Sequence, residues 1–446
     1  MKTIILIILV AIFSAFPLKA IELSLEDCRK MALESDELVK IAKNRVTQSN
    51  LDKGVATTAY LPKIDGSASA FYMTPNSSMG DAMELQMRGV YLAGFSLVQP
   101  IYAGGKIYTA NKLAKLGQEA ARQQLEATEM DVVANAEKSY WMYIAVRSKI
   151  DMLLSYIQQL DSILSYTRSA YELGLTTYLN VSRVETKMSE LQYNLRQARS
   201  GEDLCRLSLC RIIGVDDSEA IIPTEKLNVL PQSSFPFAGI ESRPELHLSM
   251  INLEAKKHDI GMVRSDFLPT IGLQLGWNAF GNMKMKNYMM LDDGTVFPYS
   301  QTISYKGFVG AVSLSVPIFH WGEGFKKVKK AKIEVENAAL ELEQNRKLME
   351  LQARQAYRNY LDGFALIESA EKAFSEAELN LKMMKEQYES GLMTLTDLLE
   401  AQSQWQSSFS NLIEAKTQLK INEVDYLRTI GATLSQREKG DKKLQE

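Results

Sequence analysis

An internal repeat is the feature of this sequence that most constrains its fold. The segment Pro100–Tyr102 recurs as Pro317–Phe319, and Tyr171–Leu175 recurs as Tyr388–Leu392, both at an offset of 217 residues. Upstream, the Leu-Pro pair at residues 61–62 recurs at an offset of 207, so the second copy holds ten more residues between these landmarks. Self-similarity in register over such a length predicts one structural unit written twice, and not the roughly two or three unrelated domains that the length alone suggests.

Two long stretches without proline predict what each copy contains. No proline occurs in residues 101–222 or in residues 318–446. Proline costs about 3 kcal/mol inside a helix, so its absence over such lengths is typical of very long helices. Each stretch is broken once, at Gly174 and at Gly391, where glycine suits a helix C-terminus and the threonines that follow suit N-caps. We therefore expect two helical hairpins, and a shorter helical segment over about residues 25–58 that leads into the first strands.

Alternation of apolar residues with small or polar ones marks strands between the prolines. Ile271, Leu273 and Leu275 alternate with glycine and glutamine, and such alternation over about ten residues suits a membrane-crossing strand. The same pattern also fits a soluble pair of β-hairpins, so this alternative stays open. In lipid, the four strands of one chain could not close a barrel, which needs about eight, and an open edge would leave backbone groups unsatisfied. One chain would then have to join others.

The first twenty residues resemble a secretory signal peptide. Lys2 precedes an apolar run over Ile4–Phe16, and the small residue Ala20 stands where cleavage is expected. The run is too short for a membrane-spanning helix, although an N-terminal anchor is the alternative. We therefore expect an exported chain.

The composition and the motifs do not favour catalysis or nucleic-acid binding. The chain holds 51 basic and 54 acidic residues, without the concentrated basic face that a nucleic acid needs. Its three histidines show no metal-ligand spacing, its three cysteines are expected as small buried residues, and neither a nucleophile–base motif nor a glycine-rich phosphate loop is visible. We expect no enzyme activity, no cofactor and no metal.

The ten extra residues of the second copy are expected in a longer hairpin loop that is rich in methionine. Residues 282–290 contain four methionines, whose thioethers can bind Cu(I). Lys284 and Lys286 lie among them and would repel a cation. A site for copper or silver is therefore the weaker interpretation of this segment.

These observations divide the chain into consecutive parts, with each repeat opening on a leading helix. The predicted parts are a signal peptide over 1–20, a first repeat over 21–214 with a strand pair over 62–100 and a helical hairpin over 101–214, a linker over 215–242, a second repeat over 243–431 with a strand pair over 269–317 and a helical hairpin over 318–431, and a polar tail over 432–446.

This arrangement resembles the TolC-type outer-membrane efflux channel family. The resemblance rests on the duplicated layout, the Leu-Pro pair after the leading helix, the Pro-Ile-Tyr/Phe strand ends and the two Tyr-x-x-Gly-Leu tips. It implies a mixed α and β fold in which three chains close one 12-strand β-barrel, continuous with a periplasmic α-helical barrel. It further implies a homotrimer in outer-membrane lipid that receives substrates from an inner-membrane transporter through a periplasmic adaptor protein.

The resemblance assigns functional residues to the two hairpin tips. Asp397 and Glu400 follow the second-tip glycine by six and nine positions, where the family has acidic residues that line a constriction. Tyr388 matches a gate tyrosine, whereas the first-tip gate aspartate is Asn180 here. Without the resemblance, the two acidic residues would be the solvated face of a helix.

Two further positions bear on this predicted periplasmic gate. The family's gate arginine is Met393 here, and Arg183 occupies in the first copy the position that Glu400 holds in the second. The salt-bridge network of the gate is therefore expected to be weaker than in the family. The tip residues implied to contact the adaptor are Gly174, Leu175, Gly391 and Leu392.

The sequence thus predicts the passive exit duct of a tripartite efflux or type I secretion system. The alternative is a periplasmic coiled-coil structural or adaptor-like protein. An adaptor would carry one helical hairpin beside a small β-rich domain, whereas this sequence predicts two hairpins, each after a strand pair. The sequence does not identify the transported substrate.

Overall fold

The computed structural model describes residues 21–74, 76–78, 83–227, 237–290, 292 and 294–432. The predicted signal peptide, most of the predicted polar tail and part of the predicted linker lie outside these residues. The chain forms two compact units, and each takes residues from both copies of the repeat. The helical unit comprises the described residues within 21–44, 122–248 and 343–432, and the strand unit comprises those within 45–121 and 249–342.

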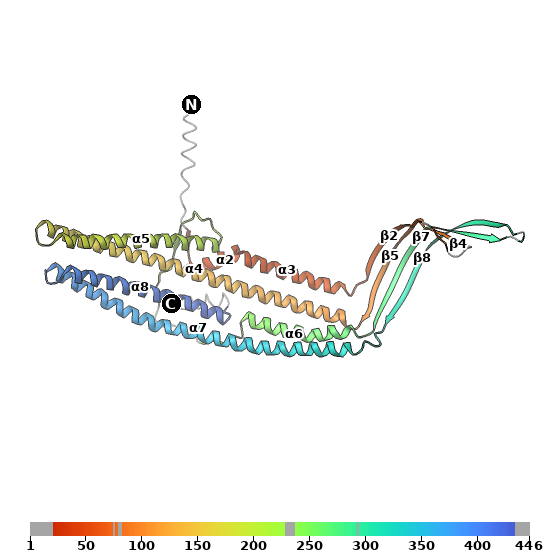
Figure 1. The fold of residues 1–446 in the computed structure, drawn as a ribbon. Coiled ribbons are helices and arrows are strands. Elements are labelled where there is room, and N and C mark those ends of the chain that lie inside the picture. The colour runs from red at the N-terminus through yellow and green to blue at the C-terminus, as the bar shows by residue number, and fades with distance from the viewer. Residues whose placement is uncertain are drawn as a thin grey trace, which may run out of the picture. The chain divides into compact units, whose positions relative to one another are not determined.

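Four long helices occupy the stretches without proline (Figure 1). α4 (Lys106–Glu172) and α5 (Tyr178–Ile213) form one antiparallel hairpin, and α7 (Glu323–Glu389) and α8 (Leu395–Thr429) form the other. Within the helical unit, all four helices contribute apolar side chains to one core, in which Tyr156 is fully buried. Over the described residues, none of the helices is both long and apolar enough to cross a membrane.

The helices that lead into the strands differ between the two copies. In the second copy, α6 (Pro244–Ser265) is a single helix. In the first copy, the helical segment predicted over about residues 25–58 has these bounds but consists of two helices, because α2 (Leu25–Ser35) ends before α3 (Glu37–Thr58) begins. Asp36 between them has an extended backbone, and its Oδ1 accepts a hydrogen bond from the Leu38 N–H at 2.7 Å. This local bond caps the new helix and competes with continuation of the old one.

Four antiparallel strands form the main part of the sheet in the strand unit. Their order is β2 (Lys63–Tyr72), β5 (Arg88–Ala103), β7 (Thr270–Met290) and β8 (Val296–Ser315). The short strand β4 (Met83–Gln86) extends the sheet along the far half of β7 and also pairs with the two-residue strand β3 (Ser77–Ser78). Over the described residues, β2 pairs only with β5 and β8 pairs only with β7, so both outer edges of the four-stranded sheet are open.

The methionine-rich segment is a strand, so the prediction that it forms a hairpin loop is wrong. β7 continues to its end at Met290, and residues 283–290 pair with β8. Methionine and lysine alternate there with a period of two, which is the period of a strand. On the other side β4 adds a partner, where Glu84 lies directly opposite Lys286 and their charged atoms are 3.7 Å apart. The pairing on both sides explains why this segment is extended.

The helical unit contains a buried ion pair that joins α2 to α4. Arg29 Nε lies 2.5 Å from Glu137 Oε1, and both side chains are almost fully buried. The Tyr140 hydroxyl, one turn further along α4, donates to the last carbonyl oxygen of β1 (Ile21–Leu23) at 2.9 Å. β1 itself pairs in parallel with β6 (Ile221–Pro223). These contacts fasten the start of the described chain to the middle of α4.

Candidate functional site

Both hairpins turn through the same backbone geometry at their tips. Gly174 and Gly391 each have a φ of 74°, a left-handed conformation that glycine adopts without the penalty of a Cβ. The amides of Leu175 and Leu392 donate to the carbonyl oxygens five residues earlier, at 2.8 Å and 2.9 Å. Each long helix therefore ends in a Schellman motif. The side chains of both leucines are exposed and stand at the outermost turn.

The second tip carries a complete capping box at the start of α8. Thr394 Oγ1 accepts a hydrogen bond from the Asp397 N–H at 3.3 Å, and Asp397 Oδ2 accepts one from the Thr394 N–H at 3.2 Å. The Thr394 hydroxyl also donates to the same carboxylate oxygen at 2.6 Å. Asp397, singled out from the sequence as a gate residue, is therefore also part of the helix cap. The Thr-x-x-Asp spacing carries the signal for this second role.

The first tip lacks this box, although its backbone turn is the same. Thr177 stands at the N-cap of α5, but its side chain makes no hydrogen bond to the helix. Asn180 occupies the position that Asp397 has in the second copy, and its Nδ2 donates to Thr176 Oγ1 at 2.9 Å. Because asparagine is neutral, it also places no negative charge at the positive end of the helix.

Side chains from the two tips contact each other across the hairpins. Arg183 on α5 donates from Nη1 to Thr396 Oγ1 on α8 at 3.1 Å. At the end of α7, the Tyr388 hydroxyl lies 3.3 Å from Thr167 Oγ1, and its ring packs edge-on against Tyr166 with centroids 5.7 Å apart. The structure thus brings Arg183 and Tyr388 into contacts between hairpins. Sequence reasoning missed their partners, since these lie 213 and 221 residues away.

The remaining gate candidates are placed by helix geometry. Glu400 is exposed and lies one turn after Asp397, which is also exposed, so both carboxylates are on one face of α8. Met393, where the family has an arginine, is half-buried next to the cap. Together, the two tips place carboxylates, hydroxyls and one guanidinium within the first turns of α5 and α8. That arrangement can attract or repel ions, and it holds the two hairpins together.

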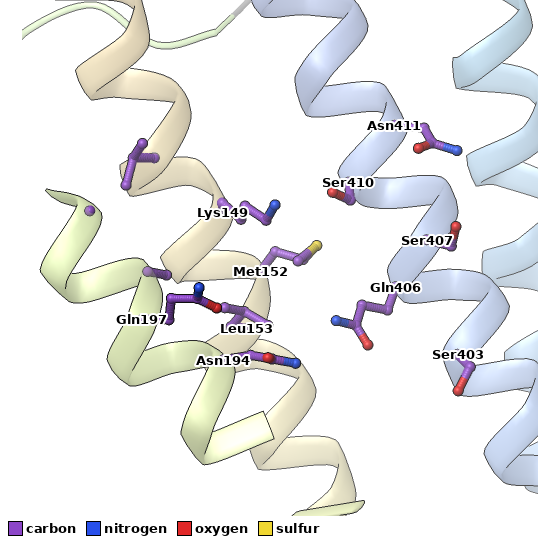
Figure 2. A pocket seen from close by; sticks show the side chains of 13 residues that line it. Lys149, Met152, Leu153, Asn194, Gln197, Ser403, Gln406, Ser407, Ser410 and Asn411 are labelled. Atoms are coloured by element: carbon purple, nitrogen blue, oxygen red, sulfur yellow. The ribbon is translucent and has the colours of Figure 1, made fainter. Parts of the chain in front are cut away.

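A groove with polar and apolar lining residues lies between the two hairpins of the helical unit (Figure 2). Its volume is about 640 Å³, and α4, α5 and α8 line it. Figure 2 shows Gln406 reaching from α8 into the space that faces Met152 and Leu153 of α4, with Lys149 above them. The α8 side chains of the groove are all polar and uncharged: Ser403, Gln406, Ser407, Ser410 and Asn411. Sequence reasoning missed this groove, although the helical spacing of these residues is a signal for a polar stripe.

The possible metal ligands and the thiols were located in the described part of the chain. Over the described residues, no group of three or more histidines, cysteines, aspartates or glutamates could hold a metal ion. Cys28 and Cys210 are buried, Cys205 is half-buried, and all three are free thiols. Burial first, and then the neighbouring Glu137 carboxylate, raise the pKa of the Cys28 thiol to about 12. This thiol is therefore protonated and unreactive at neutral pH.

The comparison with protein families gives a match along most of the chain. The sequence profile described as outer membrane efflux protein matches residues 29–215 and residues 239–432. The chain belongs to the outer membrane efflux protein family. The gap between the two matched segments falls within the predicted linker, and each matched segment includes one of the hairpin tips.

A secretion protein, an outer membrane protein and an outer membrane channel are similar to this family member over most of their length. The alkaline protease secretion protein AprF of Pseudomonas aeruginosa is 22% identical over 428 residues, which cover 91% of this chain and 84% of AprF. The outer membrane protein TolC of Vibrio cholerae is 21% identical over 355 residues, which cover 78% of this chain and 77% of TolC. The CmeC outer membrane channel of Campylobacter jejuni has a TM-score of 0.71 at 18% identity, covering 95% of this chain and 89% of CmeC.

Family membership settles the compartment and the broad class of this efflux protein. Its location is the outer membrane, and members of the family are channels rather than enzymes. The mixed, mostly helical fold is the fold of solved outer membrane channels, including VceC of Vibrio cholerae, with a TM-score of 0.74 at 14% identity over 91% of this chain and 96% of VceC. The resemblance inferred from the repeat and the tips is thereby confirmed.

Proposed function

We propose that the chain is one subunit of a homotrimeric channel that forms the passive exit duct of a tripartite efflux or type I secretion system. The observation that carries this proposal is the pair of open edges on the four-stranded sheet, at β2 and β8. In lipid, unpaired backbone groups at an edge cost several kcal/mol each, so such a sheet is stable only when it closes. Three copies supply twelve strands, which is enough for a barrel.

The helical unit supports the second part of this proposal, a tunnel in the periplasm. The long helices α4 and α7, which contribute most of their residues to this unit, have 67 residues each and are much longer than a globular core requires. The exposed tip residues Leu175 and Leu392 are each 77% accessible and are suited to contact a periplasmic adaptor protein, together with Gly174 and Gly391. The adaptor would connect the channel to an inner-membrane transporter. The adaptor-like alternative is disfavoured by the family membership and by the presence of two hairpins.

At the narrow end of the tunnel, we assign the gate to Asp397, Glu400, Tyr388, Asn180 and Arg183. In a trimer the two acidic residues would contribute six carboxylates around the axis, and the arginine would contribute three positive charges. The remaining negative charge favours cations over anions weakly. Asp397 would serve both the gate and the cap of α8, since its carboxylate is exposed and also bonded to Thr394.

The assembly is tested by measuring the mass of the protein after detergent extraction from outer membranes. We expect a trimer, by native mass spectrometry and by light scattering, because one chain cannot satisfy its own sheet edges. A monodisperse monomer that keeps its β-structure in detergent would contradict the proposal.

The docking surface is tested by placing charge on both tips. The double variant Leu175→Asp with Leu392→Asp should abolish efflux while leaving trimers in the membrane, because a buried charge at an apolar contact is costly. The matched control is Leu175→Met with Leu392→Met, which keeps the apolar surface and should keep efflux. Normal efflux in the aspartate variant would remove the tips from the docking surface.

A further inference from the structure

The internal repeat extends to the hydrogen-bond register of the sheet. The pairing of β2 with β5 runs from Lys63↔Val98 to Phe71↔Val90 without a shift. The repeat offsets of 207 and 217 residues can be added to the residue numbers of β2 and β5, respectively. The pairs then become Thr270↔Ser315 through Asn278↔Gly307. Those are the pairs that β7 and β8 form. The two sequence offsets therefore describe real equivalences in the strand unit.

The junction between the two copies within the chain is the pairing of β5 with β7. Under the same offsets, β8 is equivalent to β5, and β2 is equivalent to β7. In a closed ring of identical chains, each β8 edge meets the β2 edge of a neighbouring copy. If the junction between chains and the junction within a chain have the same geometry, β8 pairs with the neighbouring β2 in the register that β5 has with β7.

We infer that β8 of one chain pairs with β2 of the next in a defined antiparallel register, with Leu314 opposite Ala68 of the neighbouring copy. This inference rests on the proposed trimer. The pair follows from Leu97↔Leu275, whose members map onto Leu314 and Ala68 under the two offsets. The pairs on either side follow in the same way from the junction within the chain.

The chemistry of the two edges agrees with this register. On one face of the sheet it places Leu314 opposite Ala68 and Val312 opposite Ala70, so apolar residues meet. On the other face it places serine opposite serine, in the pairs Ser315 with Ser67 and Ser313 with Ser69. A slip by one residue would place the apolar row against the serine row, because successive side chains alternate between faces.

The end of β8 provides a separate observation. β5 continues through Pro100 and a register shift to Ala103, where β7 still supports it. The equivalent residues of the second copy are 317–320, yet β8 ends at Ser315. No strand pairs with residues 317–320 in the single chain, over the part that the structure describes. We expect them to become strand when the neighbouring β2 supplies the missing partner.

That extension would bury apolar side chains that are exposed in the single chain. β5 pairs with β7 through Tyr102↔Ile271 after the register shift that follows Pro100. Under the two offsets, the equivalent pair between chains is Phe319 with Ile64 of the neighbouring copy. Phe319 is 68% exposed and Ile64 is 69% exposed. Pairing removes both from water at once, which favours assembly by the hydrophobic effect.

Paired cysteines test the register in outer membranes. The background replaces Cys28, Cys205 and Cys210 by alanine. Two test variants carry Ala68→Cys with Leu314→Cys, or Ser69→Cys with Ser313→Cys. One of these adjacent pairs is of the non-hydrogen-bonded type, in which side chains lie closer, so at least one is suited to a disulfide. Two control variants combine Leu314→Cys with Gly66→Cys or with Ala70→Cys, two residues out of register on the same face.

Mild oxidation followed by non-reducing electrophoresis, together with a measurement of mass, gives four distinguishable outcomes. Directly opposite Cβ atoms lie about 5 Å apart and diagonal residues about 7–8 Å, so we expect dimer and trimer bands at least tenfold stronger in a test variant than in the controls. Stronger bands in a control would overturn the register while leaving the trimer intact. Trimers by mass without crosslinks in any variant would show that β8 and β2 are not adjacent, and monomers by mass would reject the proposed function itself.

Discussion

The two hairpin tips share a backbone turn but differ in the side chains that start the returning helix. Both turns use a glycine with a φ of 74° and both close in the same pattern of backbone hydrogen bonds. In the second copy, Thr394 and Asp397 then form a capping box. In the first copy, Thr177 makes no cap bond and Asn180 is bonded to Thr176. The two copies of the unit therefore share the backbone turn at the tip but differ in the side-chain cap of the helix that follows it.

This difference concerns a residue that caps α8 and that, in the proposed gate, would also line the channel. A carboxylate at the third position of a helix bonds the N-cap backbone and also interacts well with the helix dipole. Asp397 does both, so a loss of channel gating on its removal could arise from a frayed helix as easily as from a lost charge. Separating the two causes requires measurements of local stability at both tips, by amide hydrogen exchange with mass spectrometry.

The largest effect is expected where the two tips are alike. Gly174→Ala and Gly391→Ala should each destabilise their tip by about 1–2 kcal/mol, because a Cβ is disfavoured in the left-handed region. Exchange of the tip amides should accelerate by about 5–30-fold in both copies, since the surrounding space is open and only the backbone strain matters. A matched control is Gly201→Ala inside α5, which also meets open space and should slow exchange, because alanine favours a helix. An effect at only one tip would mean that the turns are not equivalent.

The next effect should appear in the second copy alone. Thr394→Ala removes the cap bond to the Asp397 amide and should destabilise the first turn of α8 by about 1 kcal/mol. Thr177→Ala is the matched variant of the first copy and should change α5 by only a few tenths of a kcal/mol, since Thr177 caps nothing. The Asp397 amide and its neighbours report the change. If both variants accelerated exchange at their own tip by the same factor, relative to the unmutated protein, the proposed difference between the caps would be contradicted.

A smaller effect of opposite sign is expected when the missing cap is installed in the first copy. Asn180→Asp recreates the Thr-x-x-Asp spacing of the second tip at residues 177–180. The new carboxylate should bond the Thr177 amide and interact with the helix dipole, and slow the exchange of the first turn of α5 by an amount equivalent to about 0.5 kcal/mol. Asn180→Ala serves as the control, because it removes the bond to Thr176 without adding a carboxylate. Unchanged exchange in the aspartate variant would show that the tip geometry excludes the box.

The smallest effect on stability is expected at the contact that links the tips. Arg183 is exposed, and its bond to Thr396 should contribute less than about 0.5 kcal/mol to the stability of either helix. A double-mutant cycle with Arg183→Ala and Thr396→Val measures this coupling. The charge should matter more than the bond: in planar bilayers, Arg183→Ala should raise the preference for cations, and Arg183→Lys should not. A coupling energy above about 1 kcal/mol would assign the arginine a structural role.

Much of the fold could be predicted from the sequence, because periodicity and local chemistry determine it. The absence of proline and a single glycine turn predicted each long hairpin, and the alternation around Leu273 and Leu275 predicted a strand. The break at Asp36 was missed, because an aspartate inside a helical pattern does not reveal whether its side chain will cap a new helix. The strand over residues 283–290 was missed, because its methionines and lysines were assigned to a loop before the partners on either side were known.

For the candidate site, the sequence by itself determined which residues stand at the tips and which of them differ between the copies. Only the tertiary structure decided that Arg183 contacts Thr396, that Tyr388 packs on Tyr166, and that Arg29 and Glu137 are buried together. The physical reason is the range of the interactions. Turns and caps depend on residues within about five positions, which the sequence displays. Contacts between hairpins join residues more than two hundred positions apart and depend on how the helices pack, which local periodicity does not encode.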